Sequence, residues 1–208
     1  MDLADLKIKE YLDILQSDAP APGGGSASAL AGAQGIALFM MVAGLTAGRE
    51  KFADDQDICE KAAAEGRDLF RELTTAVDND TQAFNQVAAA YRMPKETAEE
   101  KEERSRAIRA GNLAATEVPF SVMQQALRGM EIAETLLGHS NPNAASDLGV
   151  SVLDLHAAVR GAWLNVKINL PGLRDAEKED RFRRQGSDIC SRSAKIAERV
   201  YNETENKL

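Results

Sequence analysis

Three consecutive glycines and a serine, Gly23 to Ser26, stand directly before a long run of small apolar residues. Glycine removes every Cβ from this short loop, and Pro20 and Pro22 favour an extended entry into it. The run behind the loop is typical of a helix, and Ser26 is a natural N-cap for it. Because the first turn of a helix presents unpaired N–H groups at the positive end of its dipole, this pattern predicts a site for anions or carbonyl oxygens.

The same loop also has a purely structural interpretation, because a Pro-Gly loop before an alanine-rich helix is commonly only a connection to the core. It is not a Walker loop, since no Gly-Lys-Ser/Thr ends it. It is not a dinucleotide-binding turn either, since an amphipathic segment rather than a β-strand precedes it. These residues alone leave both interpretations open.

Composition limits the class of protein. The 208 residues suit one domain, 1–208, and their 44% hydrophobic but only 5% aromatic content favours helices packed through small side chains. A net charge of −8 argues against nucleic-acid binding. Cys59 and Cys190 show no metal spacing, and two histidines alone cannot form a zinc site, so we expect no metal and a reducing cytoplasmic location. The apolar run from 25 to 45 is long enough to span a bilayer, but alanine and glycine are weakly apolar, so we expect a core helix and no membrane association.

Apolar residues recur at helical spacing along almost the whole chain, and no strand alternation or internal repeat is visible. Thr97 and Glu100 form a capping-box pattern before one of the helices. Pro119 is expected to kink that helix rather than end it, and a bend is expected near Gly66 in the preceding helix. The predicted helices are 3–17, 27–46, 54–91, 98–136, 146–170 and 176–207.

The predicted fold is therefore all-α, an elongated bundle of about six helices, some of them long and kinked. Helices that approach forty residues would be ~55 Å long, which a 208-residue globule accommodates only if it is elongated or dimeric. Stripes of small residues in the 27–46 helix, Ser28 with Gly32 and Ala31 with Gly35, would suit the seam of a homodimer.

The sequence of the chain resembles a known family. This family comprises the cyclodeaminase domain of formiminotransferase-cyclodeaminase and the related stand-alone bacterial methenyltetrahydrofolate cyclohydrolases. Seven motifs occur in the family's order with similar spacing over nearly the whole chain. They are the segments 21–26 (APGGGS), 44–52 (GLTAGREKF), 80–84 (DTQAF), 93–101 (MPKETAEEK), 118–119 (VP), 146–150 (SDLGV) and 165–170 (NVKINL). The chain departs from the family at Gly44, where Asn is common, and at Arg49-Glu50, where Lys-Lys is common; Arg49 and Lys51 remain as cations.

The resemblance implies one-carbon chemistry on tetrahydrofolate. The first expectation is a cyclodeaminase that converts N5-formiminotetrahydrofolate to N5,N10-methenyltetrahydrofolate and ammonia. The alternative is a methenyltetrahydrofolate cyclohydrolase, which opens the same ring with water to give N10-formyltetrahydrofolate. Both pass through a tetrahedral carbon, and both need proton transfer at nitrogen or oxygen. A third interpretation, from another class, is a non-catalytic helical interaction protein that binds no folate.

The motifs place the candidate site residues. Asp80, Lys95 and Asp147 are the candidate catalytic residues, as proton acceptors or donors. Each also has a structural interpretation: an ion pair for Asp80, a solvated loop cation for Lys95, and a favourable helix-end charge worth ~0.3–1 kcal/mol for Asp147. The candidate substrate-binding residues are Gly23, Gly24, Gly25, Ser26, Arg49, Lys51, Ser146, Asn165 and Asn169.

Some of these candidates cannot share one small site within a single chain. Asp147 and Asn165 lie on the same face of one predicted helix but ~27 Å apart along it. They would serve opposite ends of a long ligand, or sites shared between subunits. The expected partners are a tetrahydrofolate derivative as substrate, with or without a polyglutamate tail, and further copies of the chain in a homodimer or larger ring. No tightly bound cofactor is expected, and with no transferase domain attached the substrate would arrive by diffusion.

Overall fold

The computed structural model describes residues 2–208 and contains six α-helices, with no strand in that range. The all-α prediction is thus confirmed. The helices are α1 (Ile8–Leu15), α2 (Gly24–Thr46), α3 (Gln56–Arg92), α4 (Ala98–Thr135), α5 (Ala145–Asn169) and α6 (Ala176–Glu205), and short 3-10 turns lie between several of them. The Ala21–Pro22 peptide bond before α2 is cis.

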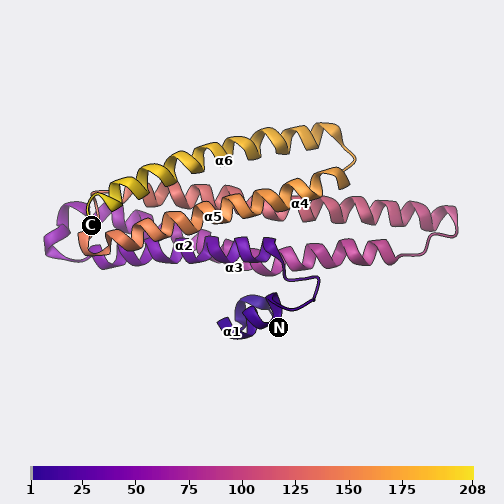
Figure 1. Cartoon of the computed structure of the whole chain (residues 1–208), viewed down its shortest axis with the longest axis horizontal. Helices are drawn as coiled ribbons and strands as arrows, with labels where there is room; N and C mark the ends of the chain where they lie inside the picture. The colour runs from indigo at the N-terminus through magenta and orange to yellow at the C-terminus, as the bar shows by residue number, and fades with distance from the viewer. Residues whose placement is uncertain (1) are drawn as a thin grey trace.

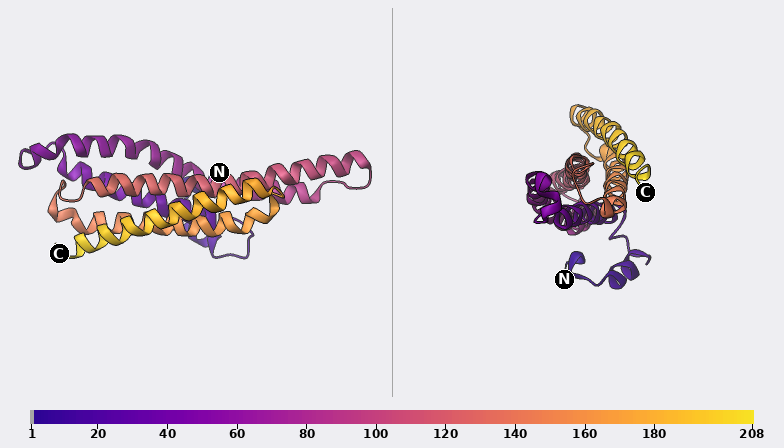
Figure 2. Two further views of the ribbon diagram at one scale, coloured as in Figure 1. Left: turned by 90° about the horizontal axis from the view of Figure 1, so that it is seen from above. Right: turned by 90° about the vertical axis from the view of Figure 1, so that its left-hand side faces the viewer.

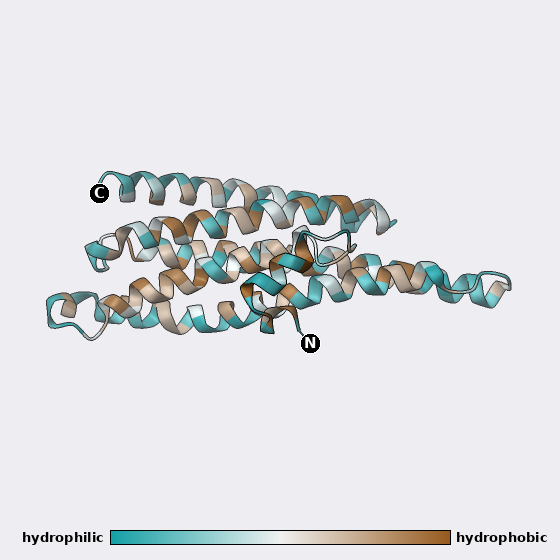
Figure 3. Cartoon of the chain, turned by 60° about the horizontal axis from the view of Figure 1, so that its bottom comes forward, coloured by the Kyte–Doolittle hydropathy of each residue, from teal (hydrophilic) through white to brown (hydrophobic). Residues whose placement is uncertain are grey.

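Helices α2 to α6 lie roughly along one axis and form an elongated bundle in which successive helices run in opposite directions (Figures 1 and 2). The 37 residues of α3 and the 38 of α4 make each of them about 55 Å long, as the sequence predicted. The end of α3 and the start of α4 project beyond the other helices as a hairpin (Figure 1). In Figure 3 this projecting tip is mostly hydrophilic, whereas apolar residues are concentrated along the middle helices.

Helix α2 forms the centre of the bundle and packs along both α3 and α5. A Cβ on Gly35 would lie 2.7 Å from the Leu155 side chain and 2.7 Å from the Ser151 carbonyl oxygen of α5. The Ser151 hydroxyl donates a 2.7 Å hydrogen bond to the Gly35 carbonyl oxygen, so the two helices meet backbone to backbone. A Cβ on Gly32 would lie 3.2 Å from the Leu73 side chain and 3.3 Å from the Ala158 side chain. The small residues of α2 are therefore used inside the chain, not at a homodimer seam as the sequence suggested.

The structure confirms two local predictions about α4, the capping box at its start and its continuation through Pro119. The Thr97 hydroxyl accepts from the backbone N–H of Glu100, and the Glu100 carboxylate accepts from the N–H of Thr97, which confirms the capping box. Helix α4 continues through Pro119, as expected. Gly66 lies against the Phe39 and Met40 side chains of α2, where a Cβ would approach to 2.6 Å; close helix packing accounts for this glycine.

The N-terminal segment differs most from its prediction, which was one amphipathic helix from 3 to 17 covering the core. A 3-10 turn at Leu3–Asp5 and helix α1 are separated by Lys7, whose backbone is extended. We call residues 2–15 the N-terminal arm. Figures 1 and 2 show α1 set apart from the bundle, and Ile8 is 82% exposed. Tyr11 is the buried residue of α1.

By length and composition α2 could cross a membrane, and half of its most apolar window is buried inside the bundle. That burial is typical of the core helix of a helical bundle. Both cysteines, Cys59 and Cys190, are free and buried.

The close contact between α2 and α5 predicts opposite effects for two glycine substitutions in the same helix. Gly35→Ala should destabilise the protein by about 1–3 kcal/mol, because its methyl group overlaps α5. Gly44→Ala should stabilise it by about 0.5–1 kcal/mol, because nothing lies within 4 Å of the new Cβ and alanine is the better helix former. Urea unfolding followed by circular dichroism measures both. Equal effects of the two substitutions would contradict this packing.

Candidate functional site

The clearest polar cluster joins the start of α2 to the middle of α3. The backbone N–H of Ser26 donates to Oδ2 of Asp80 at 3.0 Å, and the Ser26 hydroxyl lies 3.3 Å from the same oxygen. That hydroxyl also lies 2.7 Å from the carbonyl oxygen of Val77 and 3.2 Å from the hydroxyl of Thr81. Ser26 is fully buried, so this contact fixes one oxygen of the Asp80 carboxylate against the first turn of α2.

The second oxygen of Asp80 faces bare backbone. A Cβ on Gly25 would lie only 2.0 Å from Oδ1 and 2.4 Å from the carboxyl carbon, so the carboxylate occupies the space that a side chain would need. Among residues 2–208, no group donates a hydrogen bond to Oδ1, which leaves this oxygen for solvent or a substrate. The glycine predicted to form a ligand loop thus makes room for the Asp80 carboxylate.

The structure corrects the predicted cap of α2. The N-cap residue is Gly23, which has no side chain to offer, and Ser26 lies inside the first turn. Asp80, which lies on α3, caps the first turn of α2 instead, since its carboxylate accepts from an N–H of that turn. The sequence could not indicate this, because the acceptor comes from 54 residues further along the chain.

Helix α5 brings Asn165 to the same place. Its side-chain nitrogen lies 3.4 Å from the position of a Cβ on Gly24, and it donates to the Gly161 carbonyl oxygen at 2.9 Å. Ser28 stands next to it and donates to the carbonyl oxygen of Gly24 at 2.6 Å. The predicted residues Gly23, Gly24, Gly25, Ser26, Asp80 and Asn165 therefore lie close together, and we call this group the Asp80 cluster.

Burial and hydrogen bonding act on Asp80 in opposite directions. Removal from water raises its pKa above the ordinary 3.8, whereas the backbone and side-chain hydrogen bonds from Ser26 lower it. Desolvation is the larger cause, so the net pKa is raised. A carboxyl group with a raised pKa exchanges protons more readily near neutral pH, which suits general acid–base chemistry.

Tyr11, within the predicted 3–17 helix, was not among the candidate site residues. Tyr11 is only 5% exposed, and its hydroxyl is buried without a hydrogen-bond partner. Burial is the main cause that raises its pKa, and the charge of Asp80 raises it further, so the phenol lies within the field of that carboxylate. The one available signal was a tyrosine, rather than Phe or Leu, on an apolar helix face.

The remaining candidates lie elsewhere. Asn169 is one turn beyond Asn165 and donates to the Ala115 carbonyl oxygen at 2.7 Å. Lys95 is exposed in the loop between α3 and α4, and roughly 18 Å of helix separates Asp80 from the end of α3 at Arg92. One subunit therefore does not bring Lys95 to Asp80.

The other four candidates lie at the opposite end of the bundle. Helix α2 is roughly 33 Å long between Gly24 and Thr46. The backbone N–H of Asn141, in the turn before α5, donates to the Thr46 hydroxyl at 2.9 Å. This end contains Arg49, Lys51, Ser146 and Asp147, with Asp147 in the first turn of α5. Within one chain the predicted residues thus form two separate groups.

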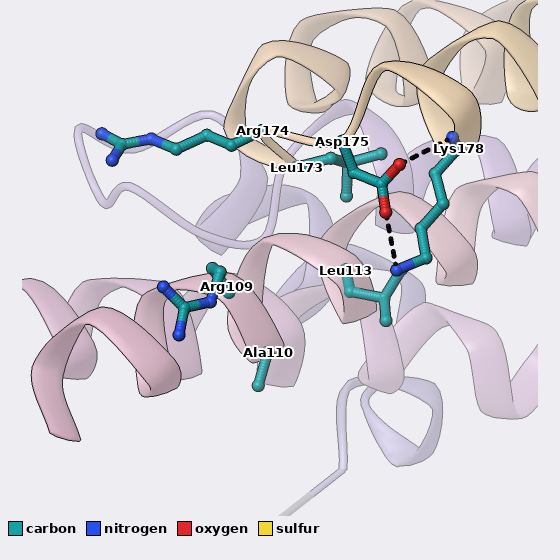
Figure 4. Close-up of a pocket in the computed structure, with 7 residues that line it drawn as sticks. All are labelled: Arg109, Ala110, Leu113, Leu173, Arg174, Asp175 and Lys178. Carbon is teal, nitrogen blue, oxygen red and sulfur yellow. Dashed lines mark hydrogen bonds and ion pairs between the residues drawn. The ribbon is translucent and has the colours of Figure 1, made fainter. Parts of the chain in front are cut away.

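A hollow of about 290 Å³ lies between α4 and the start of α6. Figure 4 shows Arg109 and Arg174 directed to the same side of it, with Asp175 paired to Lys178 through a 3.0 Å ion pair. Arg174 has a left-handed backbone, with φ 52°. This cationic hollow is separate from the Asp80 cluster. Among residues 2–208, no three His, Cys, Asp or Glu side chains are placed to hold a metal ion.

The amino-acid sequence is similar to those of several known proteins. The profile of the formiminotransferase-cyclodeaminase family matches residues 7–188. Methenyltetrahydrofolate cyclohydrolase from Methylorubrum extorquens is 35% identical over 201 residues, which are 97% of each chain. Formimidoyltransferase-cyclodeaminase from Gallus gallus is 34% identical over 172 residues, covering 83% of this chain and 31% of that protein. The chain spans about a third of the length of such relatives.

The fold has a close counterpart among solved structures. The crystal structure of formiminotetrahydrofolate cyclodeaminase from Thermotoga maritima superposes with a TM-score of 0.79 and 25% sequence identity. The alignment covers 100% of this chain and 98% of that chain.

The geometry of Gly25 predicts a site-specific defect. Gly25→Ala should displace the Asp80 carboxylate, because the added methyl group and Oδ1 cannot occupy the same space. Turnover should fall at least ~10-fold while helical content is retained, since alanine favours the helix. Gly44→Ala is the matched control, because it lies at the other end of the same helix and nothing lies within 4 Å of its Cβ. Equal kinetics of both variants on a folate substrate would remove Gly25 from the site.

Proposed function

Because the chain belongs to the formiminotransferase-cyclodeaminase family, we propose that it acts on the one-carbon unit carried between N5 and N10 of tetrahydrofolate. The first reaction is deamination with ring closure: N10 attacks the formimino carbon, a tetrahedral carbon forms, and the formimino nitrogen leaves as ammonia. The tetrahydrofolate derivative is the substrate, and no further cofactor takes part.

One observation carries this proposal: a half-buried carboxylate with one oxygen fixed by Ser26 and the other free beside glycine backbone. In deamination Asp80 takes the proton from N10 as the N10–carbon bond forms. The proton is then available for the nitrogen that leaves. Holding N10 against the carbon is an orientation effect, and the bare first turn of α2 gives the flat pterin close access to the backbone.

Ring hydrolysis is the second candidate, and the end-to-end similarity to a methenyltetrahydrofolate cyclohydrolase specifically favours it. Here Asp80 takes a proton from water as the water oxygen attacks the bridging carbon. The carbon–N5 bond then breaks as N5 takes a proton and the new hydroxyl loses its own, which leaves N10-formyltetrahydrofolate and releases one proton to solvent. The same carboxylate serves both reactions. Purified protein assayed with N5-formimino- and N5,N10-methenyltetrahydrofolate decides between them, and turnover of neither would leave the non-catalytic interpretation.

The role of Asp80 predicts a loss of turnover without loss of stability. Asp80→Asn should lower kcat by a factor of roughly 10²–10⁴ with little change in KM, since the amide fills the site but accepts no proton. The pKa of Asp80 is raised in the folded state, so its ionisation favours unfolding as pH rises above 3.8. At pH 7 the neutral amide should therefore unfold at the same temperature as the wild type, or higher.

Steady-state kinetics and thermal unfolding on one preparation test both parts of this prediction. Asp68→Asn is the control, because Asp68 is an exposed carboxylate on the same helix. The acid limb of the wild-type pH–rate profile should lie above pH 3.8 and should disappear in Asp80→Asn. Wild-type kcat in that variant would exclude Asp80 as the base.

We further propose that the working form is a homodimer whose sites combine the two groups of candidate residues. Large apolar side chains are exposed along the adjacent helices α2 and α5, with Ile168 78% and Leu164 63% exposed. Exposed apolar side chains that recur along two packed helices are typical of a subunit interface. We call the exposed apolar residues of α2 and α5 the apolar surface; they are Leu30, Met41, Leu45, Val150, Leu153, Leu164 and Ile168.

The register of α5 supports a particular symmetry for this dimer. Asp147 and Asn165 lie at equal distances along the sequence on either side of His156. A two-fold axis that crosses the apolar surface at this level, at right angles to the helices, brings Asp147 of one subunit opposite Asn165 and Asp80 of the other. Arg49 and Lys51 then extend the same site, where cations suit the carboxylates of a folate tail.

A composite site predicts complementation between inactive variants. Asp80→Asn and Asp147→Asn should each be inactive as homodimers. A heterodimer of the two, co-expressed with two affinity tags and purified on both in turn, holds one intact site and one doubly altered site. It should regain about half of the wild-type activity per dimer, because symmetric sites contribute equally.

The control pairs Asp80→Asn with Gly25→Ala, two changes in the same half of the site, which should give no recovery. Sedimentation velocity should report a dimer in every case. A monomeric active enzyme, or an inactive Asp80→Asn/Asp147→Asn heterodimer, would mean that each site belongs to one chain.

A further inference from the structure

The cationic hollow lies where the chain turns from α5 into α6 and packs against α4. Leu173, in this turn, is 6% exposed and belongs to the core. The Asn112 side chain of α4 donates to the Gly172 carbonyl oxygen at 2.9 Å, and a Cβ on Gly172 would lie 2.8 Å from that side chain. The turn is therefore held closely against α4, and Arg174, which follows it, lines the hollow together with Arg109 of α4 (Figure 4).

A second, smaller hollow adjoins the first. Its volume is about 130 Å³, and Arg109 and Arg174 line both hollows. Arg104 lines the smaller one. Among residues 2–208, the only carboxylate that lines either hollow belongs to Asp175, which is ion-paired with Lys178 at 3.0 Å. Three arginines, which we call the arginine cluster, thus surround two adjoining hollows with no carboxylate left to neutralise them.

The arginine cluster carries positive charge that the chain does not compensate. Other arginines nearby are paired: Arg106 lies 3.4 Å from Glu102 on α4, and Arg183 lies 3.8 Å from Glu179 on α6. In the described part of the chain, no member of the arginine cluster forms an ion pair. Acidic side chains are not scarce, since the net charge is −8. A local cluster of this kind is what an acidic protein needs in order to attract an anion.

Neutral groups hold two members of the cluster in place. Nη2 of Arg104 donates to the Tyr91 carbonyl oxygen at 3.2 Å, and Nη1 of Arg109 donates to the Ser105 hydroxyl at 2.7 Å. Neither acceptor carries a charge. The side chain of Arg174 makes no hydrogen bond to any of residues 2–208. The guanidinium groups of Arg109 and Arg174 therefore keep N–H donors for a ligand, and Figure 4 shows both directed to the same side of the hollow.

The backbone of Arg174 gives a separate reason to ask what its side chain does. Its φ is 52°, in the left-handed region, and among residues 2–208 no other residue except glycine has a positive φ. The other two such residues are Gly48 and Gly138. Glycine adopts this conformation without a steric penalty, whereas arginine does not. Backbone conformation thus favours glycine at position 174, and the arginine side chain requires another explanation.

We propose that the cationic hollow binds a small free oxyanion that carries several charges, either an oligophosphate or a tricarboxylate. Guanidinium groups form paired, charge-assisted hydrogen bonds with both phosphate and carboxylate groups. The volume of about 290 Å³ is near the lower limit of small-molecule sites, roughly 300 Å³, and so suits a compact anion. The site contains no residue of the Asp80 cluster, and the proposal does not depend on the folate reaction.

Isothermal titration calorimetry with tripolyphosphate and with citrate tests this site on the full chain at about 0.15 M salt. One of the two probes should bind, with one molecule per chain, and should raise the unfolding temperature. The probe that binds identifies the ligand as a phosphate or a carboxylate. Arg109→Gln and Arg174→Gln should each weaken binding by roughly 10- to 100-fold, because each removes charge-assisted hydrogen bonds but keeps a long polar side chain.

Arg174→Gly separates a ligand role from a structural one. This variant should unfold at a higher temperature than the wild type, because glycine adopts the left-handed backbone without strain. It should also lose affinity for the probe by at least the factor found for Arg174→Gln. A gain in stability together with a loss of binding is not expected of an arginine that serves the fold alone.

Arg106→Gln is the matched control, because Arg106 is an exposed arginine on α4 whose partner is Glu102. It should bind the probe as the wild type does, and so should Asp80→Asn. Binding of neither probe would overturn the proposal, as would an equal loss in Arg106→Gln, which would indicate diffuse attraction. A less stable Arg174→Gly variant with unchanged binding would assign Arg174 a structural role and overturn it as well. None of these outcomes bears on the folate reaction.

Discussion

The hydrogen bond from the Ser26 backbone to Asp80 is the constraint on which the rest of the site depends. It requires the first turn of α2 to meet the middle of α3 without a side chain between them, which is why a Cβ at Gly25 would collide with the carboxylate. In the same turn of α2, Asn165 of α5 comes close to Gly24, so α5 also lies beside this contact. The backbone contacts of α2 with α5 further along the bundle supply that closeness.

Two opposing effects act on the pKa of Asp80 at this contact. The positive end of α2 and the Ser26 hydrogen bonds favour the ionised carboxylate, whereas burial favours the protonated one, and burial dominates. A carboxylate capped by a helix but left in water would be a weaker base with an ordinary or low pKa. Burial beside glycine backbone thus fixes the carboxylate while raising its pKa, which is the combination that the proposed proton transfer requires.

Much of the fold could be predicted from the sequence, because helical periodicity, the Thr97 capping box and the terminating prolines are local signals. The failures have physical reasons. Serine is a common N-cap residue, which is why Ser26 was predicted to be one. Its N–H instead donates to Asp80, 54 residues away, and no local sequence pattern indicates such a partner. The first segment shows helical spacing, yet Lys7 is extended and α1 leaves Ile8 exposed, since apolar periodicity does not say what a helix will pack against. The burial of Tyr11 could not be predicted either, because it depends on where α1 docks.

The length of the bundle bears on how the remaining candidates work together. The long helices each run some 33–55 Å in one direction. One chain therefore cannot bring residues from opposite ends of the bundle into one small site. A single subunit places Asp80 and Asn165 in one half of α2's length, and Asp147 with Arg49 in the other. In the proposed homodimer, an antiparallel partner would present the second group where the first group ends, and it would cover the apolar side chains that α2 and α5 leave exposed. This proposal would give elongation, exposed apolar side chains and the division of the candidate residues one physical explanation.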